Sequence, residues 1–257
     1  MFRVQNYVGK PVLMSKSTSM VSWKQGGCPG PKHILGGACV KDVDKYVDKR
    51  AEELIEIADA VWDFSEVGFK EIRSSKIQGD YLERQGFKVT RGAGGIPTAI
   101  VAEWGNGRPI IGFLGEYDAL AGVSQEVLPV RKARVEGGPG HGCGHNLLGT
   151  ASLGAAVALK DALGERSESA TIRYYGCPAE ELLAGKVYMA REGLFDDLDI
   201  AISWHPGSLN SVRLGSGTAL NSAKFQFFGK TAHAAGDPHH GRSALDAVEL
   251  MNVGANY

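Results

Sequence analysis

Three apolar segments, each followed at once by polar or charged residues, constrain the fold of this chain most strongly. They are residues 110–114, which lead to Glu116 and Asp118, residues 171–175, which lead to Glu180 and Glu181, and residues 200–204, which lead to His205. Helix-like segments at 147–163 and 185–193 alternate with them, a rhythm typical of an α/β fold with a mostly parallel sheet flanked by helices. In such sheets ligands bind at the carboxyl ends of the strands, so these polar side chains are expected at one edge.

A glycine-rich turn, Gly140–Asn146, stands just before the helix-like segment and carries Cys143 and His145. Glycines allow a tight turn in which a thiolate and an imidazole face one point. Each residue alone is more often a packing residue than a ligand, and a Cys–His nucleophile pair is a further interpretation. Together with His205 and the carboxylates, the pair forms a ligand set for Zn²⁺, Mn²⁺ or a similar ion.

Composition excludes several classes of partner. The 257 residues carry a formal net charge of -1, so no basic surface favours nucleic acid. No apolar run approaches the roughly 20 residues that span a bilayer, so we expect no membrane partner. The 4 cysteines are too few for a disulfide framework in a chain of this length, which favours a reducing compartment and a cytoplasmic location.

Three regions are expected along the chain. Residues 1–41 contain no acidic residue and form a poorly ordered or foreign extension, with a transit peptide or an early start codon as open alternatives. Residues 42–213 form a metal-binding catalytic domain that opens with one long amphipathic helix, and a second helix fits 74–85. Residues 214–257 begin a second domain, in which 219–229 alternates as a strand and 243–256 fits an amphipathic helix.

Several motifs, read together, resemble the M20 metallopeptidase/amidohydrolase family. The matching stretches are Leu114–Leu120, Gly140–Thr150, Tyr175–Glu181, Trp204–Pro206, Gly229–Ala235 and Gly241–Ala247. The resemblance extends from about Lys45 to the last residue and does not cover the first 40 residues. It implies metal-dependent hydrolysis of the amide bond of small N-acyl amino acids such as an N-acyl glutamate, with other aminoacylase or dipeptidase activities of the family as alternatives.

The resemblance also implies a role for each site residue. Two divalent ions, Mn²⁺ or Zn²⁺, would be bound by Cys143, His145, Glu181 and His205. Glu180 would be the general base, and His233 would contact the substrate from the lid domain. Asp118 would be an acid beside the first ligands. Many members of the family have a metal-binding histidine where this chain has Glu116, whose role is left open. Leu182 and Leu183 replace an expected glycine-rich turn, which puts the local loop shape in question.

In the family the lid domain is an insertion, after which the catalytic domain resumes and supplies one more metal-binding histidine. This sequence ends at Tyr257, inside the expected lid. We therefore expect an incomplete catalytic domain with little activity by itself, and a homodimer, or a heterodimer with a homologous subunit, formed through the lid. A non-catalytic metal-binding subunit is the main rival. A nucleotide-binding module is disfavoured because the glycine-rich turn lacks the G-x-G-x-x-G order.

Overall fold

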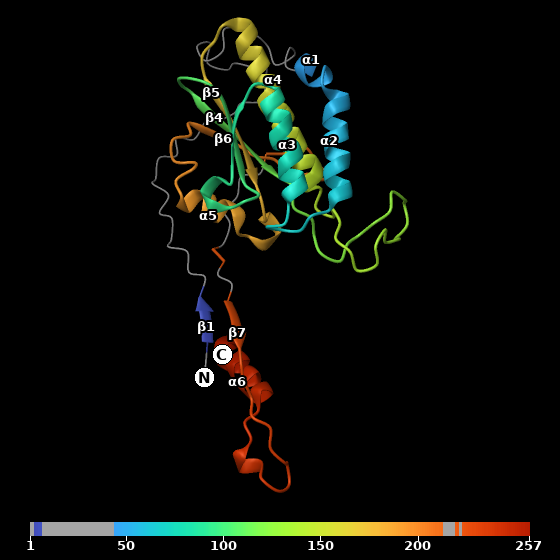
Figure 1. Ribbon diagram of the computed structural model, residues 1–257, viewed down its shortest axis with the longest axis vertical. Helices are drawn as coiled ribbons and strands as arrows, with labels where there is room; N and C mark the ends of the chain where they lie inside the picture. Colours follow the sequence, from blue (N-terminus) through green and yellow to red (C-terminus); the bar gives the residue numbers. More distant parts are fainter. Residues whose placement is uncertain (1–2, 7–43, 213–218, 221–222) are drawn as a thin grey trace. The chain divides into compact units, whose positions relative to one another are not determined.

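A computed structural model describes residues 3–6, 44–212, 219–220 and 223–257. The chain divides into two compact units, Ser17–Asn210 and the combination of Met1–Lys16 with Ser211–Tyr257. Among its described residues, the larger unit holds a five-stranded sheet and five α-helices, whose arrangement can be followed in Figure 1.

The sheet of the larger unit has the strand order β2-β3-β5-β4-β6. Its strands are β2 (Lys88–Arg91), β3 (Ile100–Gly105), β4 (Ile110–Glu116), β5 (Thr171–Cys177) and β6 (Ile200–Ile202). Strand β4 pairs in parallel with β5 and β6, whereas β2–β3 and β3–β5 are antiparallel. The α/β class is confirmed, but the expectation of a mostly parallel sheet is wrong. The connection 92–99 is too short for a crossover helix, so β2 and β3 can pair only as antiparallel neighbours.

The helices of this unit lie close to their expected positions, with one difference. They are α1 (Asp44–Asp48), α2 (Ala51–Phe64), α3 (Ile72–Arg84), α4 (His145–Arg166) and α5 (Gly185–Arg191). The single helix expected from Asp42 is interrupted between α1 and α2, where the guanidinium of Arg50 donates to the Tyr46 carbonyl and pairs with Asp161. Helix α4 begins at His145 because Gly144, with φ 78°, turns the chain in a left-handed conformation.

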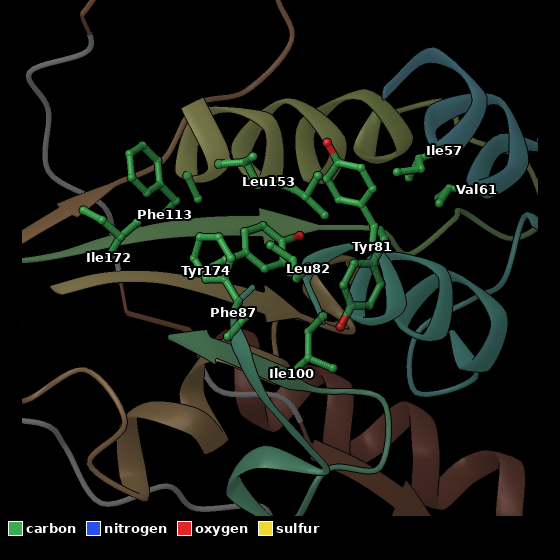
Figure 2. Close-up of a cluster of buried hydrophobic side chains, with 14 of the residues drawn as sticks. Ile57, Val61, Tyr81, Leu82, Phe87, Ile100, Phe113, Leu153, Ile172 and Tyr174 are labelled. Carbon is green, nitrogen blue, oxygen red and sulfur yellow. The ribbon is translucent and has the colours of Figure 1, made fainter. Parts of the chain in front are cut away.

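Helix α4 is the central helix of the larger unit. Its residues Leu153, Ala156 and Val157 are fully buried and belong to one core with Tyr81, Leu82 and Ile172 (Figure 2). Contrary to the sequence expectation, α4 is long and apolar enough to cross a membrane by length and composition alone. However, 61% of its most apolar window is buried within the protein, as in the core helix of a globular domain.

Gly149 sets how closely α4 approaches strand β4. A Cβ atom at this position would lie 2.3 Å from the main-chain oxygen of Glu116, so only glycine allows the helix to lie this near. The close approach brings the first residue of α4, His145, to the carboxyl end of β4. The packing of the core therefore positions the site.

Among its described residues, the second unit contains a two-stranded antiparallel sheet and one α-helix. Strand β1 (Arg3–Asn6) pairs with β7 (Ala223–Gln226), and α6 (Ala244–Asn256) follows. The Ser243 hydroxyl caps α6 by accepting from the Asp246 amide at 3.0 Å. The helix agrees with the expected 243–256, whereas the described strand is shorter than the expected 219–229, of which 221–222 lie outside the described residues. Of the expected N-terminal extension, all but 3–6 lies outside them as well.

Candidate metal centre

Side chains from four segments meet at the carboxyl ends of the parallel strands. Glu116 ends β4 and Asp118 follows it, His145 begins α4 after Cys143, Glu180 and Glu181 lie in a short helix η3 (Glu180–Leu182) after β5, and His205 follows β6. The ligand atoms of Cys143, His145 and His205 lie within 4.8 Å of one another. Those of Glu116, His145 and Glu180 do so as well. The segments that the sequence predicted at one edge do converge there.

His145 lies at the centre of the cluster and is completely buried. Its Nδ1 is 2.9 Å from an oxygen of Asp118, and because that carboxylate accepts, the ring nitrogen donates. Its Nε2 is 3.1 Å from Glu116 Oε2 and 3.7 Å from Glu180 Oε2. Burial alone would lower the pKa of His145, but the hydrogen bond to Asp118 and the charge of Glu116 outweigh it and raise that pKa.

Asp118 links the two halves of the cluster. One oxygen accepts from His145, and the other accepts from the main-chain amide of Glu181 at 2.8 Å. A carboxylate that holds the Nδ1 side of an imidazole fixes the ring orientation and leaves Nε2 to face the site, as in many metal centres. Asp118 therefore orients both His145 and Glu181.

Cys143 and His205 form the outer part of the cluster. The Cys143 Sγ lies 3.2 Å from His205 Nε2, and the His205 and His145 rings have centroids 5.7 Å apart. Burial, followed by the nearby charge of Glu181, raises the pKa of the Cys143 thiol to about 11. A nucleophilic cysteine requires a lowered pKa, so the surroundings of Cys143 disfavour that role and suit a thiol that ionises only on binding a cation.

Unpaired buried atoms indicate that the cluster fits a cation. Three atoms of the cluster have no hydrogen-bond partner: His145 Nε2, Glu116 Oε2 and Glu181 Oε1. The first two face each other at 3.1 Å. Buried polar atoms are almost always paired, and a lone pair that faces carboxylate oxygens is stabilised by a shared positive charge. Thiolate, imidazole and carboxylate together suit borderline divalent ions such as Zn²⁺ or Mn²⁺.

Two residues that sequence reasoning missed support the cluster. Lys186, on α5, forms an ion pair with Glu116. Glu71 is completely buried and accepts from the Ala179 amide at 2.8 Å, at the residue before Glu180. Burial raises the pKa of Glu71. Neither residue stands in a motif, so the sequence held no signal for either.

The loop after β5 takes its shape without the expected glycines. Ala179 and Leu183 have φ values of 55° and 53°, in the left-handed region that favours glycine. The amide hydrogen bond from Ala179 to Glu71 fixes the first of these turns. Glu180 and Glu181 therefore lie between two left-handed residues, in a loop that has Leu182 and Leu183 in place of the expected glycines.

His233 lies in the other unit. Its Nδ1 accepts from the amides of Ala235 and Gly236, and the side chain is exposed. Asp237, His239 and His240 also gather in that unit, all exposed. These four residues belong to the second unit, and the substrate-contact role of His233 remains a prediction.

Known proteins of similar sequence include two hydrolases. The chain is 46% identical over 216 residues to one of the subunits of p-aminobenzoyl-glutamate hydrolase from Escherichia coli strain K12, covering 84% of this chain and 45% of that protein. It is 28% identical to the Xaa-Arg dipeptidase of Homo sapiens over 86% of this chain and 52% of the relative. No family model matches. The chain spans about half the length of the curated relatives it matches.

Among solved structures, the aminobenzoyl-glutamate utilization protein from Klebsiella pneumoniae has the same fold, with a TM-score of 0.53 at 18% identity over 81% of this chain and 58% of that one. The fold and the site define an α/β protein whose sheet edge carries a cluster of metal-ligand residues. The chain belongs to the M20 metallopeptidase/amidohydrolase family.

Proposed function

We propose that this chain is the catalytic part of a metal-dependent hydrolase that cleaves the amide bond of N-acyl amino acids. The observation that carries the proposal is the buried Nε2 of His145, which faces carboxylate oxygens without a hydrogen-bond partner. The 46% identical relative is named for hydrolysis of p-aminobenzoyl-glutamate, and that compound or a similar N-acyl glutamate is the proposed substrate.

The ligand set of the proposal is Cys143, His145, Glu181 and His205, which would hold two divalent ions, Mn²⁺ or Zn²⁺. Bound there, the ions would supply Lewis-acid polarisation of the amide carbonyl and a water of lowered pKa. Asp118 would keep these ligands oriented, through its hydrogen bonds with His145 Nδ1 and the Glu181 amide.

Glu180 is proposed as the general base and acid. Burial, and then the charge of Glu116, raise the pKa of Glu180, while Lys186 and His145 oppose the shift. A raised carboxyl pKa brings the group nearer to neutral pH, where proton transfer in both directions is efficient. Glu180 would take the proton of the attacking water and return it to the leaving amine. His233, from the other unit, is proposed to contact the substrate near the developing oxyanion.

The proposed assembly is a homodimer, or a heterodimer with a homologous subunit, formed through residues 214–257. Two relatives support a pairing of related chains, because they are named as two different subunits of p-aminobenzoyl-glutamate hydrolase, one from Escherichia coli and one, as a homolog, from Haemophilus influenzae. A cytoplasmic location is proposed with it. Light scattering of the purified chain, alone and mixed with its homologous partner, measures the assembly.

The deciding experiment measures metal content and hydrolysis of p-aminobenzoyl-glutamate on the same preparation. It compares residues 1–257 with a chimera in which the remaining part of the Escherichia coli relative follows Tyr257. We expect metal in both proteins and faster hydrolysis by the chimera. Comparable turnover by residues 1–257 would show that the site is complete within them. Metal without hydrolysis in either protein would favour the non-catalytic role.

Cys143 provides a second test, since a ligand and a nucleophile tolerate different replacements. Cys143→Asp should keep part of the metal and part of the hydrolysis, because a carboxylate also binds divalent ions. Cys143→Ala is the matched control, because its side chain offers neither a thiol nor a carboxylate. Trapping of a covalent acyl group on Cys143 would overturn the ligand assignment.

A further inference from the structure

We propose that Glu116 is an additional ligand of the metal centre and that Lys186 is the positioning residue that fixes which Glu116 oxygen faces the ion. The inference rests on the proposed metal centre and adds to it a residue pair that the family resemblance left without a role. It is carried by the contacts of the two carboxylate oxygens.

Glu116 cannot withdraw from the site. It is the last residue of β4, and only 6% of it is exposed. Its main-chain oxygen lies against Gly149 of α4, so the backbone is held between strand and helix. A carboxylate at this position must satisfy its charge within the cluster, because burying an unpaired charge is costly.

The two oxygens of Glu116 have different surroundings. Oε1 forms the ion pair with the ammonium of Lys186, which reaches in from α5. Oε2 has no hydrogen-bond partner and lies 3.1 Å from His145 Nε2. Lys186 thus occupies one oxygen and leaves the other directed at the nitrogen that is proposed to bind metal.

A shared cation would stabilise the contact between Oε2 and the neutral Nε2. Because His145 Nδ1 donates to Asp118, the neutral ring presents a lone pair at Nε2. Two lone-pair groups then face each other, with Glu180 Oε2 at 3.7 Å as a third. Imidazole nitrogen with two carboxylate oxygens is a suitable set for a divalent ion, and the oxygens favour a hard ion such as Mn²⁺ over Zn²⁺.

A purely structural ion pair looks different in the same protein. At the far end of α4, Asp161 has both oxygens engaged, one by Arg50 and the other by Lys160 at 2.9 Å. Glu116 has only one oxygen engaged although it is more deeply buried. An ion pair with a purely structural role would not leave the second oxygen of Glu116 without a partner.

The test compares Glu116→Gln, Lys186→Met, Lys186→Arg and the control Asp161→Asn in the chain of residues 1–257. Mn²⁺ and Zn²⁺ affinities are measured by competition with a chromophoric chelator, and the Co²⁺-loaded proteins by visible absorption. We expect Glu116→Gln to weaken binding about 10- to 100-fold, more for Mn²⁺ than for Zn²⁺, and to intensify the Co²⁺ d–d bands as the coordination number falls. Lys186→Met should show a smaller loss of affinity, and Lys186→Arg and Asp161→Asn should bind as the parent does.

Parent-like affinity and an unchanged Co²⁺ spectrum in Glu116→Gln would overturn the ligand assignment and leave the proposed function intact. Loss of affinity in Glu116→Gln with none in Lys186→Met would overturn the positioning role alone. A parent chain that binds no ion would refute the proposed metal centre itself, and this inference with it. If circular dichroism shows Glu116→Gln to be unfolded, Glu116→Leu, which has no ligand oxygen, replaces it, and parent-like affinity in that variant would count against ligation.

Discussion

The charged side chains at the two ends of helix α4 have opposite arrangements. At its C-terminal end the acids Asp161 and Glu165 are balanced by Lys45, Arg50 and Lys160, and none of their side-chain atoms is left buried and unpaired. At its N-terminal end Glu116, Asp118, Glu180 and Glu181 surround His145 and Lys186, and three buried atoms there have no partner.

This difference separates a structural charge cluster from a candidate functional one. In a balanced cluster, as at the C-terminal end, each acid has a basic partner, so no uncompensated charge is buried. A cluster with an excess of carboxylates is destabilising until a cation is bound, and proteins keep such clusters where function requires them. Substitutions at the two ends should therefore differ in the size and sign of their effects.

The largest effect is expected from the adjacent acids of the N-terminal end. In the form that turns over, Glu180→Gln should keep its metal and lose about 10²- to 10⁴-fold in kcat, because it removes the proton-transfer group. Glu181→Gln should instead lose metal, measured by elemental analysis after gel filtration. Equal metal loss in both variants would contradict the division of roles.

Removing Asp118 should have the largest effect on stability. Asp118→Ala takes the partner from His145 Nδ1 and from the Glu181 amide, both in the buried part of the cluster. We expect a loss of about 3 kcal/mol in the free energy of unfolding, measured with urea in the presence of chelator. His205→Ala, at an exposed position, is the control and should stay within about 0.5 kcal/mol of the parent. Similar losses in both variants would show that burial does not distinguish the two parts of the site.

At the balanced end, Asp161→Asn should cost about 1–2 kcal/mol at neutral pH, the scale of a charge-assisted hydrogen bond. Burial raises the pKa of Asp161, but its hydrogen bonds to Lys160 and Arg50 more than offset this and lower that pKa.

The pH dependence of this effect has a definite sign. Because the folded-state pKa of Asp161 lies below the unfolded value of about 3.9, its contribution is complete above that value and is lost as the pH falls through the folded pKa. Urea unfolding at about pH 6 and at about pH 3 should therefore give a smaller difference between parent and Asp161→Asn at the acid pH. A difference that grows on acidification would refute the sign.

The smallest effect should have the opposite sign. In metal-free protein at pH 7, Glu180→Gln is expected to stabilise the fold by up to about 1 kcal/mol, discounted for its partial exposure to solvent, because burial and Glu116 disfavour the charged form. Thermal unfolding with chelator measures it, and the gain should disappear once metal is added. Destabilisation of the metal-free variant would show that repulsion between carboxylates does not destabilise the cluster at the N-terminal end of α4.

The sequence by itself determined which strand ends carry the site. Apolar segments followed by acids or histidine predicted β4, β5 and β6 and the convergence of Asp118, the Glu180–Glu181 pair and His205, because β-strands bury alternate or continuous apolar residues and parallel strands end at one edge. The glycine-rich turn likewise placed Cys143 and His145 at the start of a buried helix. These are local patterns, formed by residues that are consecutive in the chain.

Only the tertiary structure decided the contacts between elements distant in sequence. Three such contacts join residues about 70 or more positions apart. They are the antiparallel pairing of β3 with β5, the ion pair of Glu116 with Lys186, and the hydrogen bond from the Ala179 amide to the Glu71 carboxylate. Such contacts depend on how α4 and α5 pack against the sheet, which no local periodicity records. The physical reason is that burial and charge pairing act through space: the same carboxylate is a solvated loop residue or a buried site residue according to which elements close over it.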